Sequence, residues 1–302
     1  MKRFSIIAAA ALVCTAAIAK APKPDSVRIA KYRDAKAAAV SFTFDDGSLD
    51  HYTLVAPELE KNGLRGTFWI IGNSVGTWAV SADQVRDLSD RGHEIGNHTW
   101  SHADLVKIDA EAVRTEIART DSLLESITGK RPEAVAFPFN RYDKSVLAEA
   151  MKGRVACRTW QTGQGQARNK STAEGMTRWL DKVVAEGRWG ITMTHGITSG
   201  YDAWEDETIL WHFFAEVASR QDEIWVDTFS RIGAYAAERD ACVLVTSQKG
   251  RMLTVTPQCS LDETLYHEPL TLVVTLDGVD HCLSFNPFSG PITINLRKLA
   301  RE

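Results

Sequence analysis

Residues 37–240 alternate between short apolar runs and longer amphipathic stretches. The runs of strand length lie at residues 38–44, 66–72, 93–97, 134–138, 155–159, 189–194 and 224–226. Between them the apolar residues recur at helical spacing, most clearly over residues 109–128. Strands that alternate with helices predict a parallel sheet covered by helices, and seven such units approach the eight of a closed barrel. The pattern therefore predicts an α/β barrel.

The pattern changes after about residue 240. Leu270, Leu272, Val274 and Leu276 alternate with polar or small residues, and Asp277-Gly278 is a tight-turn signal after them. Alternation with a period of two is typical of strands that are buried on one face. We therefore expect a barrel domain over residues 20–240 and a small antiparallel β appendage over residues 241–302.

The first residues have the features of a secretory signal peptide. Lys2 and Arg3 are followed by an apolar run from Phe4 to Ile18, and Ala17-Ile18-Ala19 is a small-x-small cleavage site. We expect residues 1–19 to be removed, which leaves a secreted or periplasmic protein. The run is shorter than the roughly 20 residues of a membrane span, and no later segment is long and apolar enough for one, so no span is expected in the mature chain.

Composition narrows the class of protein. The 302 residues are 44% hydrophobic and 25% charged, with a net charge of −4, as in an ordinary globular protein. The sequence has no basic stripe, so a nucleic-acid partner is not expected. Cys157, Cys242, Cys259 and Cys282 follow the signal segment and allow one or two disulfides in an oxidising compartment, with the pairing open.

Chemically active residues follow three of the predicted strands. Asp45 and Asp46 end the first strand, His98 and His102 follow the third, and His195 follows the sixth. Barrel enzymes carry their chemistry at the carboxyl ends of the strands, where these residues are expected to meet. Adjacent carboxylates point in different directions, so one can bind a metal while the other faces substrate. An ordinary Asp-Gly turn is the alternative for the first pair.

The two histidines favour a metal site. His98 and His102 are four residues apart, so both imidazoles share one face of a helical turn. Two nitrogens and one carboxylate leave open positions for water, as in catalytic zinc sites, where the pKa of bound water falls to about 7. Zinc is the expected cofactor, and these ligands also suit cobalt or nickel. His195 is placed to protonate a leaving group. His51 is expected at a solvated helix start.

Five segments, in this order, resemble the polysaccharide deacetylase family, the nodulation-type chitooligosaccharide deacetylases and their relatives in carbohydrate esterase family four. They are Thr43–Gly47, Gly92–His102, Ala136–Asn140, Trp160 and Thr192–Gly196. The first two match the motifs of the family most closely, whereas the fourth motif is unclear. The resemblance covers roughly residues 36–240 and implies a distorted (β/α)7-type barrel.

The resemblance also implies roles for these residues. Asp46, His98 and His102 would bind the metal, Asp45 would be the general base that activates water, and His195 would be the general acid. The backbone N–H of a residue in the third motif helps to hold the oxyanion, and that donor does not depend on the side chain.

By the same resemblance, Phe139 supplies this N–H, Asn140 stands where the family has Gly, and Trp160 is the candidate for an aromatic wall. Many family members have an Arg at the position of Ala136, which pairs with the catalytic Asp. Arg131 and Arg141 are nearby candidates to replace it.

Asp227 ends the last predicted strand. It is a candidate to orient His195, with a helix N-cap as the alternative.

The sequence thus predicts a secreted, metal-dependent hydrolase that removes N-acetyl groups from an acetylated oligo- or polysaccharide. Two alternatives remain open, an O-acetyl esterase acting on xylan or a similar glycan, and an inactive carbohydrate-binding protein. The sequence does not indicate the oligomeric state or whether the β appendage binds glycan.

Overall fold

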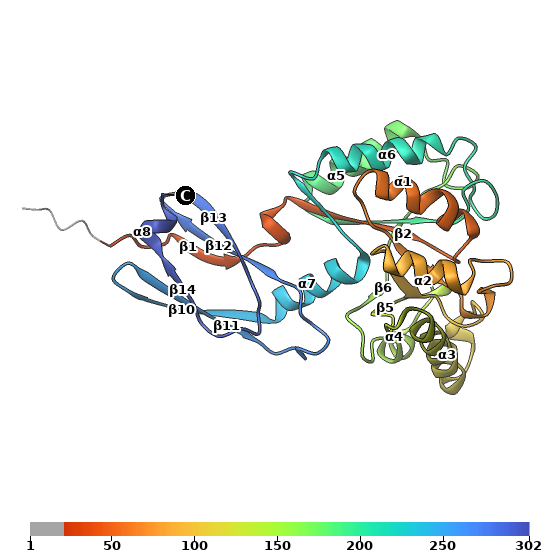
Figure 1. Ribbon diagram of the computed structural model, residues 1–302, viewed down its shortest axis with the longest axis horizontal. Helices are drawn as coiled ribbons and strands as arrows, with labels where there is room; N and C mark the ends of the chain where they lie inside the picture. Colours follow the sequence, from red (N-terminus) through yellow and green to blue (C-terminus); the bar gives the residue numbers. More distant parts are fainter. Residues whose placement is uncertain (1–20, 302) are drawn as a thin grey trace, which may run out of the picture.

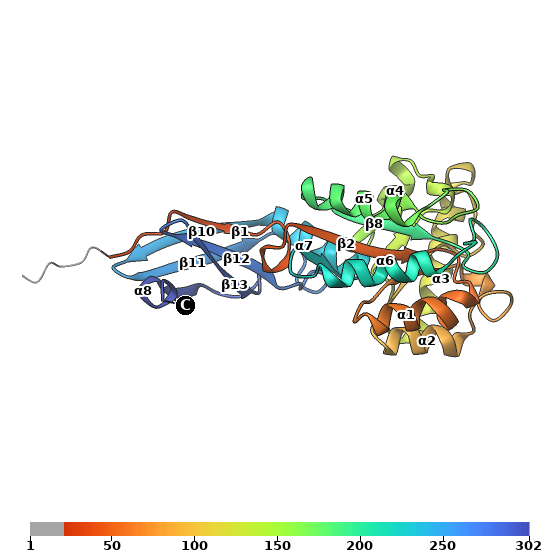
Figure 2. The same ribbon diagram turned by 90° about the horizontal axis from the view of Figure 1, so that it is seen from above.

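The computed structural model describes residues 21–301, so the predicted signal peptide, residues 1–19, lies outside the described residues. Figures 1 and 2 show two parts end to end, a broad α/β part and an elongated β part. Of the described helices, none has the length and apolar character needed to cross a membrane.

The α/β part is built on one curled parallel sheet. Its strands are β2 (Ala38–Phe44), β3 (Thr67–Ile70), β4 (Glu94–Asn97), β5 (Ala134–Ala136), β6 (Ala156–Arg158), β7 (Thr162–Gly163), β8 (Trp189–Thr194) and β9 (Ile224–Val226). The order is β6-β5-β4-β3-β2-β8-β7. Strands β6 and β7 end this order on opposite sides, yet only residues 159–161 separate them. The sheet therefore curls until its edges approach, which confirms the predicted distorted (β/α)7-type barrel; β7 was not predicted.

Strand β9 is shorter than a full barrel strand. It pairs with β2 only over Ala38–Val40, at the start of that strand. Strand β3 pairs with β2 at the carboxyl end, at Thr43 and Phe44. Strand β9 therefore ends partway along the barrel, well below the carboxyl ends of its neighbours.

Within residues 21–301, seven helices cover the sheet. They are α1 (Ala56–Lys61), α2 (Ala82–Asp90), α3 (Ala110–Thr128), α4 (Lys144–Ala150), α5 (Ala173–Ala185), α6 (Thr208–Ser219) and α7 (Phe229–Ala241). A π-helical turn, His51–Val55, precedes α1. The Ser81 side chain accepts from Gln84 N–H while the Gln84 side chain accepts from Ser81 N–H, which starts α2 as a capping box.

The core explains why these segments pack. All seven residues of β2 are buried, and Phe42, Phe44 and Phe68 are fully enclosed between sheet and helices. Burial of each large apolar side chain contributes about 1.5–3 kcal/mol. Strand β2 is therefore a rigid base for the residues that follow it.

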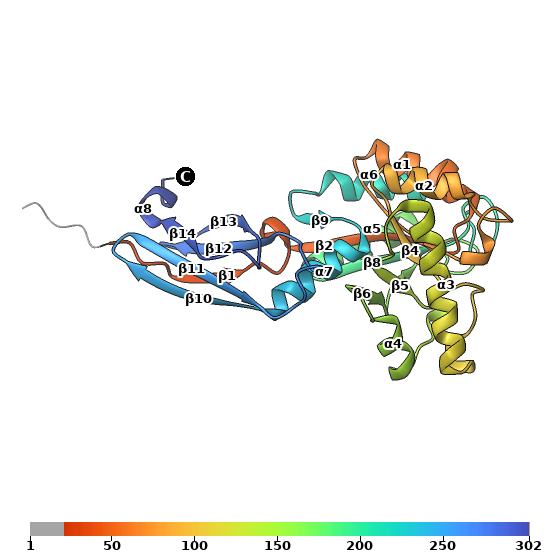
Figure 3. The same cartoon turned by 60° about the horizontal axis from the view of Figure 1, so that its bottom comes forward.

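The β part contains two three-stranded antiparallel sheets, shown in Figure 3. One consists of β1 (Ser26–Ile29), β12 (Leu270–Leu276) and β13 (Val279–Phe285); the other consists of β10 (Cys242–Lys249), β11 (Met252–Cys259) and β14 (Ile292–Asn295). The short helix α8 (Leu296–Leu299) follows β14. Strand β1 lies within the segment assigned to the barrel by sequence, but it pairs with β12. The β part is therefore made from both ends of the described chain.

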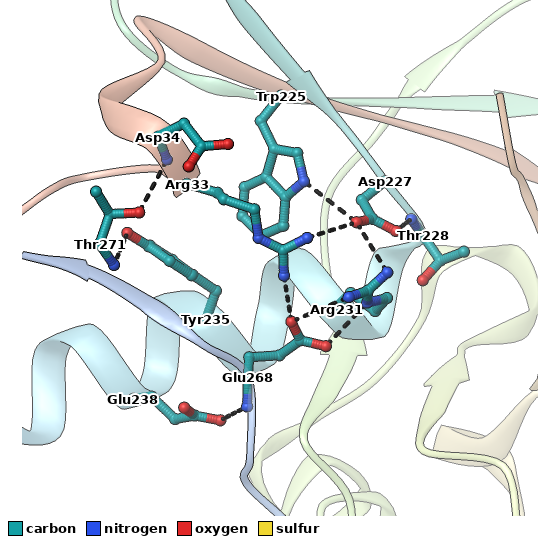
Figure 4. Close-up of polar contacts among 10 residues, drawn as sticks. All are labelled: Arg33, Asp34, Trp225, Asp227, Thr228, Arg231, Tyr235, Glu238, Glu268 and Thr271. Atoms are coloured by element: carbon teal, nitrogen blue, oxygen red, sulfur yellow. Dashed lines mark hydrogen bonds and ion pairs between the residues drawn. The ribbon is translucent and has the colours of Figure 1, made fainter. Parts of the chain in front are cut away.

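A polar joint connects the two parts (Figure 4). Arg33, from the segment before β2, bonds both Asp227 and Glu268, and its guanidinium lies 4.6 Å from the centre of the Trp225 ring. Arg231 of α7 also reaches Glu268, at 2.9 Å. Helix α7 of the barrel continues directly into β10 of the β part. The chain connection and the ion pairs therefore join the two parts at the same place.

The four cysteines of residues 21–301 are free thiols in this structure. Cys242 and Cys259 lie directly opposite one another on β10 and β11.

Candidate active site at the end of the barrel

The first two acidic residues are positioned by a tight turn after β2. Asp46 and Gly47 both have left-handed backbone conformations, with φ of 76° and 72°. A Cβ at Gly47 would lie 2.9 Å from the Ile70 side chain, so both space and conformation favour glycine there. The turn lets Asp45 and Asp46 leave the strand in different directions.

The two histidines converge through a loop rather than through the predicted helical turn. Residues 98–102 are not helical, and Thr99 and His102 have φ of 67° and 57°. The loop is held by Thr99 N–H, which donates to the Asn97 side chain at 2.7 Å. Ser101 N–H donates to Glu116 at 2.8 Å. The spacing therefore predicted the convergence of the imidazoles correctly but gave the wrong local structure.

Asp46, His98 and His102 form a cluster that fits a metal ion. One ligand atom from each lies within 4.8 Å of the others, and Asp46 Oδ1 is 3.5 Å from His98 Nε2 and 3.6 Å from His102 Nε2. That oxygen is buried and accepts no hydrogen bond from the described part of the chain. His98 Nδ1 lies 2.8 Å from the Ala136 carbonyl and donates to it, which leaves the Nε2 lone pair for a metal. Two nitrogens and a carboxylate oxygen are a donor set that suits zinc.

Asp45 is held by an arginine that sequence analysis did not identify. Arg158 of β6 is fully buried and donates to both Asp45 carboxylate oxygens, at 2.6 and 2.5 Å, and to Thr43 Oγ1 at 2.8 Å. Burial alone would raise the pKa of the Asp45 carboxyl, but the charge and hydrogen bonds of Arg158 outweigh it and hold that pKa well below its usual range. Asp45 is therefore ionised at neutral pH.

The two arginines that the sequence suggested as partners of Asp45 pair with other residues. Arg141 pairs with Asp104 at 2.7 Å, and Arg131 pairs with Asp121 at 3.2 Å. Arg158 replaces the missing Arg at Ala136 because β6 is the strand adjacent to β5 and its register places Arg158 beside Ala136. The missed signal was a single arginine inside a short strand-like run.

His195 follows β8 and faces Asp45, with its Nε2 3.8 Å from Asp45 Oδ2. The His195 carbonyl lies 2.6 Å from Nε2 of His51, which donates to it. His51 is fully buried, not solvated as expected, and burial lowers the pKa of its imidazole, so the ring is neutral. His51 therefore fixes the backbone that carries His195.

Asp227 does not lie beside His195, so the prediction that it orients this histidine is wrong. Its N–H donates to the carbonyl of Val40, five residues before Asp45 along β2, which places it roughly 16 Å lower on the barrel. Its carboxylate bonds Arg33, Arg231 and the Trp225 indole in the polar joint (Figure 4).

The polar site opens into a cavity of about 380 Å³. Besides the residues above, the lining includes Phe139, Asn140 and Tyr201. Phe139 and Asn140 have φ of 58° and 54°, and the Phe139 ring packs edge-on against His102, with ring centres 4.7 Å apart. This strained turn brings the third motif against His102 of the cluster that could hold a metal ion.

Trp160 is not part of this lining. Its side chain is 45% exposed, and its ring lies 6.3 Å from that of Trp189, the first residue of β8, at the opposite end of the strand from His195. The predicted aromatic wall is therefore not formed by Trp160.

Fold and site together define an α/β barrel with a cluster that could hold a metal ion and an ionised carboxylate at its carboxyl edge. Residues 32–155 match the family model described as polysaccharide deacetylase. Residues 32–155 are thus similar to a polysaccharide deacetylase domain, as the motifs indicated.

Two curated relatives show how far this similarity extends. A chitin deacetylase from Pestalotiopsis sp. is 34% identical over 99 residues, which are 33% of this chain and 33% of that protein. A gellan lyase from Bacillus sp. is 25% identical over 285 residues, which are 82% of this chain and 11% of that protein. The chain thus spans a third or less of the length of these two relatives.

A solved structure shows the same fold. The family 4 carbohydrate esterase from Streptomyces lividans, in complex with acetate, is similar with a TM-score of 0.50 and 19% identity. The match covers 63% of this chain and 92% of that one.

Proposed function

We propose that this chain is a secreted, metal-dependent deacetylase that hydrolyses N-acetyl groups of a glycan and releases acetate. The observation that carries the proposal is the position of one buried, ionised carboxylate, Asp45, between a metal-binding cluster and a histidine. The similarity of residues 32–155 to polysaccharide deacetylases supports a carbohydrate substrate. The signal-like residues 1–19 support secretion.

Asp46, His98 and His102 would hold the metal. A divalent ion bound there lowers the pKa of water to around 7 and polarises the acetyl carbonyl. Zinc suits the donor set best, and cobalt or nickel would also bind it.

Asp45 would act as the general base. Arg158 bonds both of its oxygens and so fixes the carboxylate, while Asp45 Oδ2 lies 3.9 Å from His98 Nε2 and 3.8 Å from His195 Nε2. The carboxylate therefore faces the space between the metal ligands and His195, where it can accept a proton from the attacking water.

His195 would protonate the leaving nitrogen. Its side chain is 16% exposed and lies beside Asp45, in the cavity that Asp46, His98 and His102 also line. The backbone N–H of Phe139 would donate to the acetyl oxygen as negative charge develops on it. The products are acetate and a free amino sugar.

The test is acetate release by the purified mature protein. N-acetylglucosamine oligomers, peptidoglycan fragments and acetylated xylan would each be incubated with added zinc, with chelator, and with the Asp45→Asn variant. We expect acetate from the N-acetylated substrates, only with zinc and only with Asp45 intact. Acetate from xylan alone would show that the protein hydrolyses acetyl esters rather than acetamides. No acetate from any substrate, with metal bound, would favour a binding role.

A further inference from the structure

The loop that begins at His195 is held by two adjacent residues that precede α1. His51 Nε2 donates to the His195 carbonyl at 2.6 Å. The Asp50 carboxylate accepts from the Thr198 N–H and hydroxyl, at 2.9 and 2.8 Å. Both residues stand at the start of the π-helical turn, in which Ala56 N–H donates to the His51 carbonyl five residues earlier. Turns of this type often occur at functional sites.

The His195 carbonyl lies beyond the last paired residue of β8 on both sides of that strand. Pairing of β8 with β2 ends at Thr194, and pairing of β8 with β7 ends at Met193. Backbone carbonyls that are not exposed to water need a donor from another source. The side chain of His51 supplies that donor, so it fixes the first backbone group after the sheet ends.

The surroundings of His51 are otherwise apolar. Its side chain is fully buried, and its ring centre lies 5.6 Å from that of Phe44 and 6.0 Å from that of Phe68. Its Nδ1 has no hydrogen-bond partner within residues 21–301. A polar ring in such a pocket is costly to desolvate. The specific contribution of a histidine here is therefore its bond to the His195 backbone.

The position of that backbone determines where the His195 imidazole lies. The ring packs against Tyr201, with ring centres 4.8 Å apart, and its Nε2 is 3.8 Å from Asp45 Oδ2. A general acid must lie within hydrogen-bond reach of the leaving atom, and a displacement of about 1 Å can lower a rate about 100-fold. Loss of the bond from His51 should therefore act mainly on proton donation by His195.

We propose that His51 is a positioning residue for His195, which the protein needs for acetamides far more than for activated esters. The inference rests on the proposed function for the role of His195. As the C–N bond breaks, its electron pair stays on the nitrogen, which takes the proton from the His195 imidazolium. The acyl carbon keeps the attacking oxygen, so acetate and an amine form. His51 is buried and acts only through the backbone of His195.

An activated ester removes the need for this proton. The 4-nitrophenolate group leaves as a stable anion, so hydrolysis of 4-nitrophenyl acetate depends on Asp45 and the attacking water but little on a general acid. A variant that misplaces only His195 therefore slows the acetamide far more than the ester. A variant that merely destabilises the barrel slows both to the same extent.

His93 offers a matched control. It is a second buried histidine that packs against Phe68, with ring centres 5.2 Å apart, and its Nδ1 accepts from Gly66 N–H at 3.1 Å. Gly66 and His93 directly precede β3 and β4, so this histidine lies at the amino end of the barrel, away from His195. His93→Leu should therefore lower stability without changing the relative rates on the two substrates.

The test compares N-acetylglucosamine oligomers with 4-nitrophenyl acetate, using the zinc-loaded full mature chain. His51→Leu should lower kcat for the acetamide about 10- to 100-fold and the ester rate less than about 3-fold. His51→Gln, whose amide nitrogen can take the place of Nε2, should recover most of the acetamide rate. The ratio of the two rates does not depend on the folded fraction, and His93→Leu should keep the wild-type ratio. An unchanged ratio in His51→Leu would overturn the inference.

Amide hydrogen exchange separates this inference from the proposed function, because it requires no activity. Gly196 N–H belongs to the same peptide unit as the His195 carbonyl, and it donates to the Tyr201 carbonyl at 3.0 Å. In His51→Leu this amide should exchange about 5-fold faster by NMR, and in His93→Leu at the wild-type rate. Faster exchange without acetate release by wild type would support the anchor and refute the deacetylase. Acetate release with unchanged exchange and an unchanged rate ratio would refute the anchor alone.

Discussion

Replacement of Arg158 by Met removes the only cation that bonds Asp45 among the described residues. The two side chains are similar in length, but Met cannot donate the three hydrogen bonds that Arg158 makes to Asp45 and Thr43. The Asp45 carboxylate is 3% exposed, so the removal of Arg158 leaves a buried negative charge without its main partner.

The cost follows from this burial. Removal of one partner of a buried ion pair leaves an uncompensated charge and typically costs about 3–5 kcal/mol of unfolding free energy. The double variant Asp45→Asn/Arg158→Met buries no charge at this place. It should therefore recover most of the stability that Arg158→Met loses, and deacetylation should fall steeply in both variants.

Urea unfolding in the presence of chelator measures these free energies without a contribution from bound metal. Arg141→Met is the control, because Arg141 pairs with Asp104 through a side chain that is 50% exposed, and such surface pairs contribute about 0–1 kcal/mol. A loss under about 1 kcal/mol for Arg158→Met, or strictly additive costs in the double variant, would refute the reasoning.

Three further predictions concern the metal, pH and the β part. Zinc at 100 times its Kd should raise the unfolding free energy of wild type by about 2.7 kcal/mol in thermal-shift measurements, and His102→Ala should lose most of this gain. Burial raises the pKa of the Glu238 carboxyl from 4.5 to about 7. The protonated side chain therefore contributes its full stabilisation below pH 4.5, and this stabilisation is lost as the pH rises through 7. Glu238→Gln should remove this part of the pH dependence, at most about 3 kcal/mol in urea unfolding between pH 4 and 8; equal slopes for wild type and variant would contradict it. Oxidised protein should contain a Cys242–Cys259 disulfide, because directly opposed antiparallel residues have Cα atoms about 4.5–5.5 Å apart, within disulfide range; peptide mapping that finds Cys157 paired instead would oppose this.

Local patterns predicted the barrel and the residues that follow its strands. The apolar runs that became β2, β4 and β8 were correct, and so was the expectation that Asp46, His98 and His102 converge. These features depend on a few consecutive residues and on a rule that applies to parallel barrels in general.

Features that depend on distant pairing were missed. Arg158 reaches Asp45 across the barrel interior from a strand more than 100 residues away. Strand β1 joins β12, more than 240 residues later, which no local alternation could reveal. Asp227 does end a strand, as predicted, but pairing with the lower half of β2 stops β9 well below the site.

The central claim is that acetate release requires one metal ion bound by Asp46, His98 and His102. The most direct measurement is a titration of zinc into chelator-treated, desalted protein, with acetate release from N-acetylglucosamine oligomers recorded at each step. The account predicts no acetate without zinc and a rate that saturates at one zinc per chain. Undiminished release by the metal-free protein would contradict it, and so would full zinc occupancy without any acetate.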